Sequence, residues 1–111
     1  MARVIVGNAF SLNMLPVEFA GSVDIRPAIG LDHLLMGGRA PINAIGHETT
    51  DAVVRNLLAM DGINLPVGQR MTVSLEAGDV LLVAQYTGPR LAEGTTVLPV
   101  GARIEWKEVR V

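Results

Sequence analysis

The spacing of hydrophobic and polar residues predicts one long amphipathic helix near the middle of the chain. Apolar residues recur at intervals of three and four over residues 47–62, which is the helical period. Five residues are expected to form its buried stripe: Val53, Val54, Leu57, Leu58 and Met60. Thr49 or Thr50 could cap its start, Asp51 suits the first turn, and Gly62 suits the end.

Five other segments have the alternating or β-branched pattern of strands. They are Arg3–Gly7, Gly21–Ile29, Arg70–Leu75, Asp79–Tyr86 and Arg103–Val111. Pro27 favours an edge position for the second of them, because proline cannot donate to a central ladder. The third and fourth are expected to pair as a hairpin across "EAGD". In the last, half-exposed strand, Ile104, Trp106 and Val109 lie nearly on one side, and Trp106 is expected in the core or an interface.

The remaining segments are less regular. Residues 9–16 could form a turn of helix or an irregular loop, and residues 42–46 a short strand or extended piece. Gly30–Pro41, which contains "MGGRAP", is predicted to be a loop. Together the elements predict a single α+β domain over residues 1–111, with a mixed four- or five-stranded sheet and flanking helices.

Composition narrows the classes of function. The chain has no cysteine and two histidines, so disulfides, thiolate zinc sites and histidine-rich metal cages are excluded, and we expect no metal and no cofactor. Its net charge is −2 without a basic stripe, which argues against binding to long nucleic acid. No apolar run approaches the roughly 20 residues of a membrane span, and the start lacks a signal-peptide pattern. We therefore expect a cytoplasmic protein without membrane contact.

His47 is the first candidate for chemistry, because it lies where the helix begins. Helix starts offer unpaired N–H groups and the positive end of the helix dipole, which together favour anions. Gly46 allows close approach of the backbone, and Thr49 and Thr50 add hydroxyl donors. A histidine beside a bound phosphate can act as a general acid. The alternative is a histidine that only hydrogen-bonds locally; His33, in the predicted loop, is assigned to the surface.

Two further segments carry candidate ligand groups. Gly88-Pro89 bends the chain before Arg90, which could clamp a phosphate with two parallel hydrogen bonds. The alternative is a surface ion pair with Glu93, worth at most about 1 kcal/mol. After the first strand, three polar residues could read riboses or adenines, or could only bond their own backbone: Asn8, Ser11 and Asn13.

Three motifs taken together resemble a known family. "NAFSLNML", "INAIGH" followed by "TT", and "GPRLAEG" resemble the viral and bacterial anti-CRISPR ring nucleases. Those proteins degrade cyclic tetra-adenylate, the second messenger of type III CRISPR defence. The resemblance spans almost the whole chain in matching order, except residues 17–41.

This resemblance implies a small α+β fold that forms a two-fold homodimer, with one cyclic tetra-adenylate across the interface. It implies cleavage without metal, in which a ribose 2′-hydroxyl attacks the adjacent phosphorus and yields di-adenylate with a 2′,3′-cyclic phosphate. By the same resemblance His47 is the general acid, and Arg90 and Glu93 stabilise the phosphate and position the active centre. The implied substrate-binding residues are Asn8, Ser11, Asn13 and Gly46 and, more loosely, Thr49, Thr50, Arg70 and Gln85.

Two other functions suit the same residues. A protein that sequesters a cyclic nucleotide without cutting it would need the same polar loop and helix start. An interaction module of a virus or mobile element would dock on another protein and need no nucleotide site.

Overall fold

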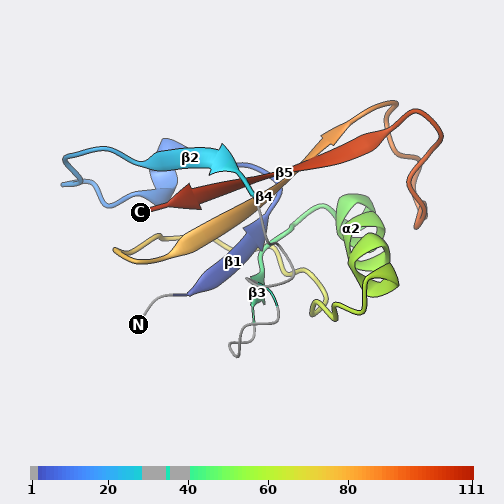
Figure 1. The fold of residues 1–111 in the computed structure, drawn as a ribbon, viewed down its shortest axis with the longest axis horizontal. Helices are drawn as coiled ribbons and strands as arrows, with labels where there is room; N and C mark the ends of the chain where they lie inside the picture. The colour runs from blue at the N-terminus through green and yellow to red at the C-terminus, as the bar shows by residue number, and fades with distance from the viewer. Residues whose placement is uncertain (1–2, 29–34, 36–40) are drawn as a thin grey trace.

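The chain folds into a mixed five-stranded sheet with a helix against one face (Figure 1). The computed structural model describes residues 3–28, 35 and 41–111. The strands are β1 (Val4–Gly7), β2 (Asp24–Pro27), β3 (Ile42–Asn43), β4 (Val80–Thr87) and β5 (Arg103–Arg110). A 3-10 turn, η1, covers Leu12–Met14, and the helix α2 covers Glu48–Met60. The α+β class and the mixed sheet predicted from the sequence are confirmed.

The strand order β2-β5-β4-β1-β3 determines where the loops gather. β1 runs parallel to both β3 and β4, whereas β5 runs antiparallel to β4 and to β2. Parallel strands end at the same edge of a sheet, so the segments that follow β1, β3 and β4 leave together. Those segments begin at Asn8, Ala44 and Gly88, and they contain the three motifs of the predicted site except Ile42 and Asn43, which form β3.

Hydrophobic side chains cover both faces of the central strands. On the α2 side the cluster consists of Val6, Leu35, Ile45, Val54, Leu58, Ile63, Leu65, Val80, Leu82 and Ala84. On the other side it consists of Ile5, Leu75, Leu81, Val83 and Val109, covered by Phe10, Met14 and Val73. The near-continuous apolar run of β4 follows from this, because its alternate residues enter two different cores.

The helix agrees with its prediction except at its two ends. His47, not Thr49 or Thr50, is the residue that precedes the first turn. Gly62 has a φ of +78° just beyond the end, as expected of a glycine there. Met60, the last residue of the helix, is 79% exposed, so it does not take part in the buried stripe.

The predicted strand Arg70–Leu75, and with it the hairpin to β4, is wrong. β4 is paired on both sides, by β1 and by β5, so no ladder position is free for this segment. Val73 and Leu75 instead pack flat on the second core, and the Leu75 N–H donates to the Met14 carbonyl. The alternating apolar residues of this segment therefore indicate that one side of it is buried, not that it pairs in the sheet.

The other strand predictions hold in outline. β2 lies at the edge of the sheet with Pro27 in it, residues 42–43 pair with β1, and η1 provides the turn of helix expected after β1. In β5, Ile104 and Trp106 pack on the α2 side, but Val109 faces the second core, since neighbours an odd number apart point to opposite faces. The loop predicted at Gly30–Pro41, with His33, lies outside the described residues except Leu35 and Pro41, which are buried.

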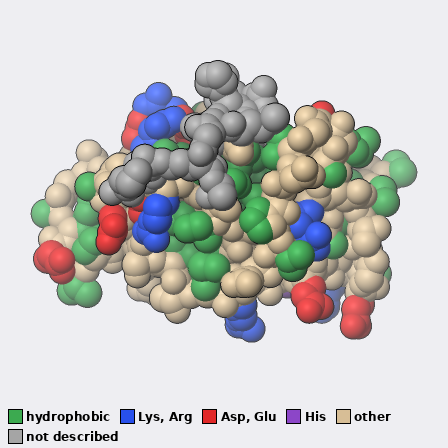
Figure 2. Space-filling model, turned by 90° about the horizontal axis from the view of Figure 1, so that it is seen from below, with side chains coloured by type: hydrophobic (Ala, Val, Ile, Leu, Met, Phe, Trp, Pro, Cys, Tyr) green, Lys and Arg blue, Asp and Glu red, His purple; other side chains and the backbone are tan. Residues whose placement is uncertain are grey.

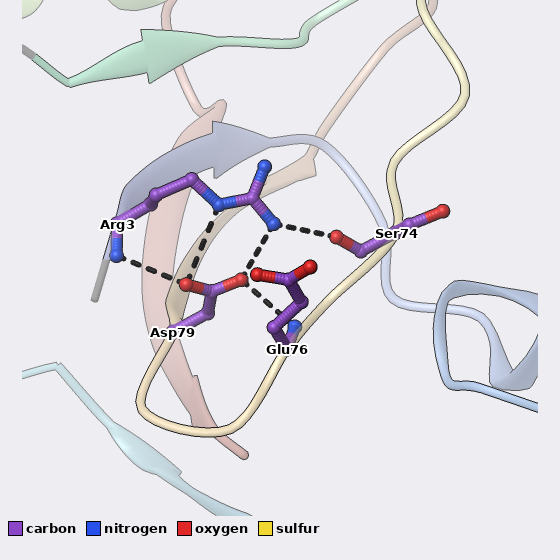
Figure 3. A network of polar contacts seen from close by, with 4 residues as sticks. All are labelled: Arg3, Ser74, Glu76 and Asp79. Atoms are coloured by element: carbon purple, nitrogen blue, oxygen red, sulfur yellow. Dashed lines mark hydrogen bonds and ion pairs between the residues drawn. The ribbon is translucent and has the colours of Figure 1, made fainter. Parts of the chain in front are cut away.

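A buried carboxylate joins the starts of β1 and β4 (Figure 3). Asp79, 1% exposed, accepts hydrogen bonds from the backbone N–H of Arg3 at 2.9 Å and from its Nη2 at 2.6 Å. The Glu76 N–H donates to the same carboxylate at 2.8 Å. Burial pushes the pKa of Asp79 upward, but the bonds from Arg3 and Glu76 outweigh it, so the pKa lies below its usual value.

This network predicts an acid-sensitive contribution to stability. Because the folded pKa of Asp79 is depressed, its contribution is present above the unfolded carboxyl pKa, about 3.9, and is lost as pH falls through the folded value. Asp79→Asn is expected to lower the free energy of unfolding by about 1–3 kcal/mol at pH 7. Denaturant unfolding from pH 7 to pH 2 should show this difference shrinking. The control is Asp24→Asn, whose exposed pair with Arg26 should contribute much less. A difference for Asp79→Asn that stays constant to pH 2 would contradict the prediction.

Candidate functional site

A cleft of about 720 Å³ opens between the start of α2 and the segment that follows β4. Its lining consists of Gly46, His47, Glu48, Thr49, Thr50, Tyr86, Arg90, Leu91, Ala92 and Glu93. Two segments about forty residues apart in the sequence thus meet across one space. The fold brings together six residues predicted for the site, including all three predicted as catalytic.

His47 is placed by the backbone at the mouth of the helix. It has an extended conformation, with φ −97° and ψ 109°, and its carbonyl accepts the first helical hydrogen bond, from the Asp51 N–H at 2.9 Å. Its imidazole is exposed in the cleft and makes no capping hydrogen bond. The N–H groups of the first turn have no acceptors inside the helix, so the same position can hold an anion. The alternative of a locally bonded cap histidine is therefore not observed.

Arg90 follows a tightly constrained turn. Gly88 has a φ of +152°, and a Cβ there would lie 2.6 Å from the Ala102 Cβ, so only glycine fits. The Tyr86 hydroxyl donates to the Pro89 carbonyl and ties this turn to β4. Within the described part of the chain, no ion pair joins Arg90 to Glu93. The guanidinium is exposed and lines the cleft.

A second hollow of about 210 Å³ adjoins the cleft. Its lining consists of Gly7, Asn8, Ala9, Met14, Ala44, Gly46, Arg70, Met71, Val73 and Leu81. Gly46 lines both spaces, so the two meet at this residue. A Cβ on Gly46 would lie 3.0 Å from the Arg70 Cγ, so glycine lets the arginine stem pack against the turn. Asn8 and Arg70 are thereby placed beside the main cleft.

Three of the predicted binding residues line neither space. The Ser11 Oγ accepts a hydrogen bond from the Asn13 N–H at 3.3 Å and caps η1, which is the local alternative weighed for this loop. Gln85 is exposed on β4, and it points to the opposite face from its neighbour Tyr86. A single chain does not bring these three residues to the cleft.

Sequence reasoning missed a buried polar network behind the cleft, and it also missed Tyr86. Asn43 Nδ2 donates to Asp51 Oδ1 at 2.6 Å and to the Pro66 carbonyl at 2.7 Å. Asp51 Oδ2 accepts from Arg55 Nε and from the Gly68 N–H, each at 3.0 Å. The available signals were an asparagine inside the apolar run "INAIG" and the i, i+4 spacing of Asp51 and Arg55.

Charged side chains of both signs are mixed on one face of the molecule: on the face shown in Figure 2, Lys and Arg side chains are scattered among acidic ones. Among the described residues, no three His, Asp or Glu side chains converge as metal ligands would. No helix of the described part has both the length and the apolar character needed to cross a bilayer.

Comparisons with known proteins find a family model and a solved structure that match this chain. The family model described as STIV B116-like matches residues 4–100, which contain every residue that lines the two hollows. The solved structure of B116 of Sulfolobus turreted icosahedral virus is similar, with a TM-score of 0.72 and 30% sequence identity. The match covers 99% of this chain and 100% of that chain. Comparison with curated proteins gives no significant match.

Proposed function

This chain belongs to the STIV B116-like family, and we propose that it is a metal-independent ring nuclease for cyclic tetra-adenylate. One observation carries the proposal: His47, Arg90, Glu93 and the start of α2 line a single cleft. In the proposal His47 is the proton donor and Arg90 binds the phosphate. Glu93 supplies a carboxylate, and the start of α2 supplies an anion site. The motif resemblance to the anti-CRISPR ring nucleases supplies the substrate.

The proposed reaction needs no nucleophile from the protein. A ribose 2′-oxygen attacks the adjacent phosphorus and forms a P–O2′ bond, while the P–O5′ bond breaks. The 2′-hydroxyl proton passes to water, and the His47 imidazolium donates a proton to the leaving 5′-oxygen. Arg90 and the first-turn N–H groups of α2 bind the non-bridging oxygens, where negative charge develops. Glu93, three residues after Arg90, positions the active centre.

A ring of four adenylates has two-fold symmetry, and within the proposal one ring lies across a homodimer of this chain. Two copies of His47 related by a two-fold axis would make two cuts in a ring of four adenylates and release two di-adenylates. Asn8 and Arg70, in the adjoining hollow, would hold the next ribose and phosphate. Ser11, Asn13 and Gln85 lie outside both spaces in one chain, so we place their contacts with the ring across the dimer. The site of action would be the host cytoplasm.

The test is an assay with protein stripped of metal by EDTA. Cyclic tri-, tetra- and hexa-adenylate are incubated separately, and the products are separated by chromatography. We expect di-adenylate with a 2′,3′-cyclic phosphate from the tetramer. An intact ring together with a raised Tm would indicate a sequestering protein. No shift in Tm with any ring would indicate an interaction module, and cleavage that requires added Mg²⁺ would overturn the metal-free reaction.

A further inference from the structure

The buried network behind the cleft has no part in the proposed chemistry, although it lies at the turn that carries His47. Asn43 ends β3 and Asp51 lies in the first turn of α2, and both are 3% exposed. Their side chains are joined by the 2.6 Å bond between Asn43 Nδ2 and Asp51 Oδ1. The two elements on either side of residues 44–47 are therefore tied together directly.

The network holds this turn from two sides. On one side, Asn43 Oδ1 accepts a hydrogen bond from the Ile45 N–H at 3.1 Å. On the other side lies Gly68, whose N–H donates to Asp51 Oδ2 at 3.0 Å. A Cβ on Gly68 would lie 2.4 Å from the Ile45 carbonyl oxygen and 2.8 Å from Asp51 Oδ1, so this approach requires glycine. Ile45, two residues before His47, has little room to move.

Asp51 also contacts His47 itself. Its backbone N–H donates to the His47 carbonyl at 2.9 Å, while its side chain anchors Asn43, Arg55 and Gly68. The His47 side chain forms no capping bond, so its backbone is what fixes where the imidazole starts in the cleft. None of Asn43, Asp51 and Gly68 lines the main cleft.

We infer that Asn43, Asp51 and Gly68 are positioning residues that hold the His47 imidazole in line for proton transfer. This inference rests on the proposed function of His47. A displaced proton donor lowers the rate of the chemical step, whereas Arg90, on the other side of the cleft, has no hydrogen bond to this network among the described residues. Disturbing the network should therefore lower kcat much more than it raises KM, and a misplacement of about 1 Å can cost about 10²-fold.

Gly68→Ala is the direct test, because its methyl group must push the Ile45 carbonyl. We expect kcat to fall by about 10–10²-fold and KM to change little. The control is Gly62→Ala, which strains the far end of the same helix: Gly62 has a φ of +78° and open space around its Cβ position. Gly62→Ala should lower Tm while leaving kcat near the wild-type value. If it lowers kcat as much as Gly68→Ala does, general loosening of the helix explains both effects.

A double variant shows whether Gly68 acts through His47. If it does, Gly68→Ala combined with His47→Ala should be no slower than His47→Ala alone, whereas independent effects would multiply. Multiplied effects would overturn the inference. Asp51→Asn is the second variant should Gly68→Ala fail to fold. It keeps the shape of the side chain but replaces one acceptor oxygen with an NH₂ group. If neither variant folds, the network serves the whole scaffold and the positioning role is rejected.

A measurement without substrate separates this inference from the proposed function. The chain has two histidines, so the imidazole signals of His47 in an NMR spectrum can be assigned by their loss in His47→Ala. Gly68→Ala should shift or broaden these signals, and Gly62→Ala should not. If the wild-type protein cleaves no ring but the shift is observed, the nuclease proposal fails while the geometric part stands. Unchanged His47 signals in folded Gly68→Ala would overturn the positioning role, whatever the activity.

Discussion

His47→Ala is expected to slow cleavage of cyclic tetra-adenylate by about 10²–10⁴-fold, the usual contribution of a general acid. Without the imidazole, the 5′-oxygen must leave as an alkoxide or take its proton from water. Binding should change little, because Arg90 and the N–H groups of α2 remain. Single-turnover rates with labelled ring, together with direct binding measurements, separate the two effects.

The matched control for this variant is His33→Ala. It removes the only other imidazole of the chain, which belongs to the segment predicted from the sequence to be a loop. Its cleavage rate should equal that of the wild type. If His47→Ala cleaves at the wild-type rate, proton donation by His47 is wrong. If it instead loses ring binding, His47 is a binding group and the sequestering alternative gains support.

The helix and the middle of the sheet could be predicted from the sequence because their patterns report burial directly. Val53, Val54 and Leu58 are spaced for one helical face, and all three are buried. Alternation alone does not indicate pairing, so the pattern of Arg70–Leu75 wrongly predicts a strand: its apolar residues cover the sheet without joining it. The paired partners of β4 come from both ends of the chain, and local patterns carry no information about such contacts.

The sequence predicts those residues of the candidate site that lie in motifs at strand ends and at the helix start. His47, Arg90 and Glu93 meet because the parallel strands β3 and β4 end on the same side of the sheet. The sequence predicts only that Asp51 suits the first turn, whereas its carboxylate is buried and accepts hydrogen bonds from three partners. That role depends on Asn43 and Gly68, and no spacing rule connects a residue to a loop seventeen positions away.

Arg90→Ala is expected to lower kcat by about 10²–10³-fold, comparable to the loss of one preorganised donor from an oxyanion site. The turn at Gly88 and Pro89 fixes the backbone just before Arg90, and its exposed side chain lines the cleft, where it can reach a phosphate. Arg90→Lys keeps the charge but loses the planar pair of donors. It should recover only part of the rate, and a full recovery would show that charge alone is needed.

The matched control for Arg90 is Arg103→Ala. Arg103 begins β5, opposite Thr87 of β4, and carries the same charge as Arg90. It is exposed, pairs with Glu105 and does not line the cleft. Its loss should leave kcat nearly unchanged at moderate salt, because long-range attraction between exposed charges is screened there. Equal losses in the two variants would mean that the arginines only attract the anionic ring through their summed charge. A loss confined to Arg90 that persists at high salt would place its guanidinium on the scissile phosphate, where contact distances are too short for ions to screen.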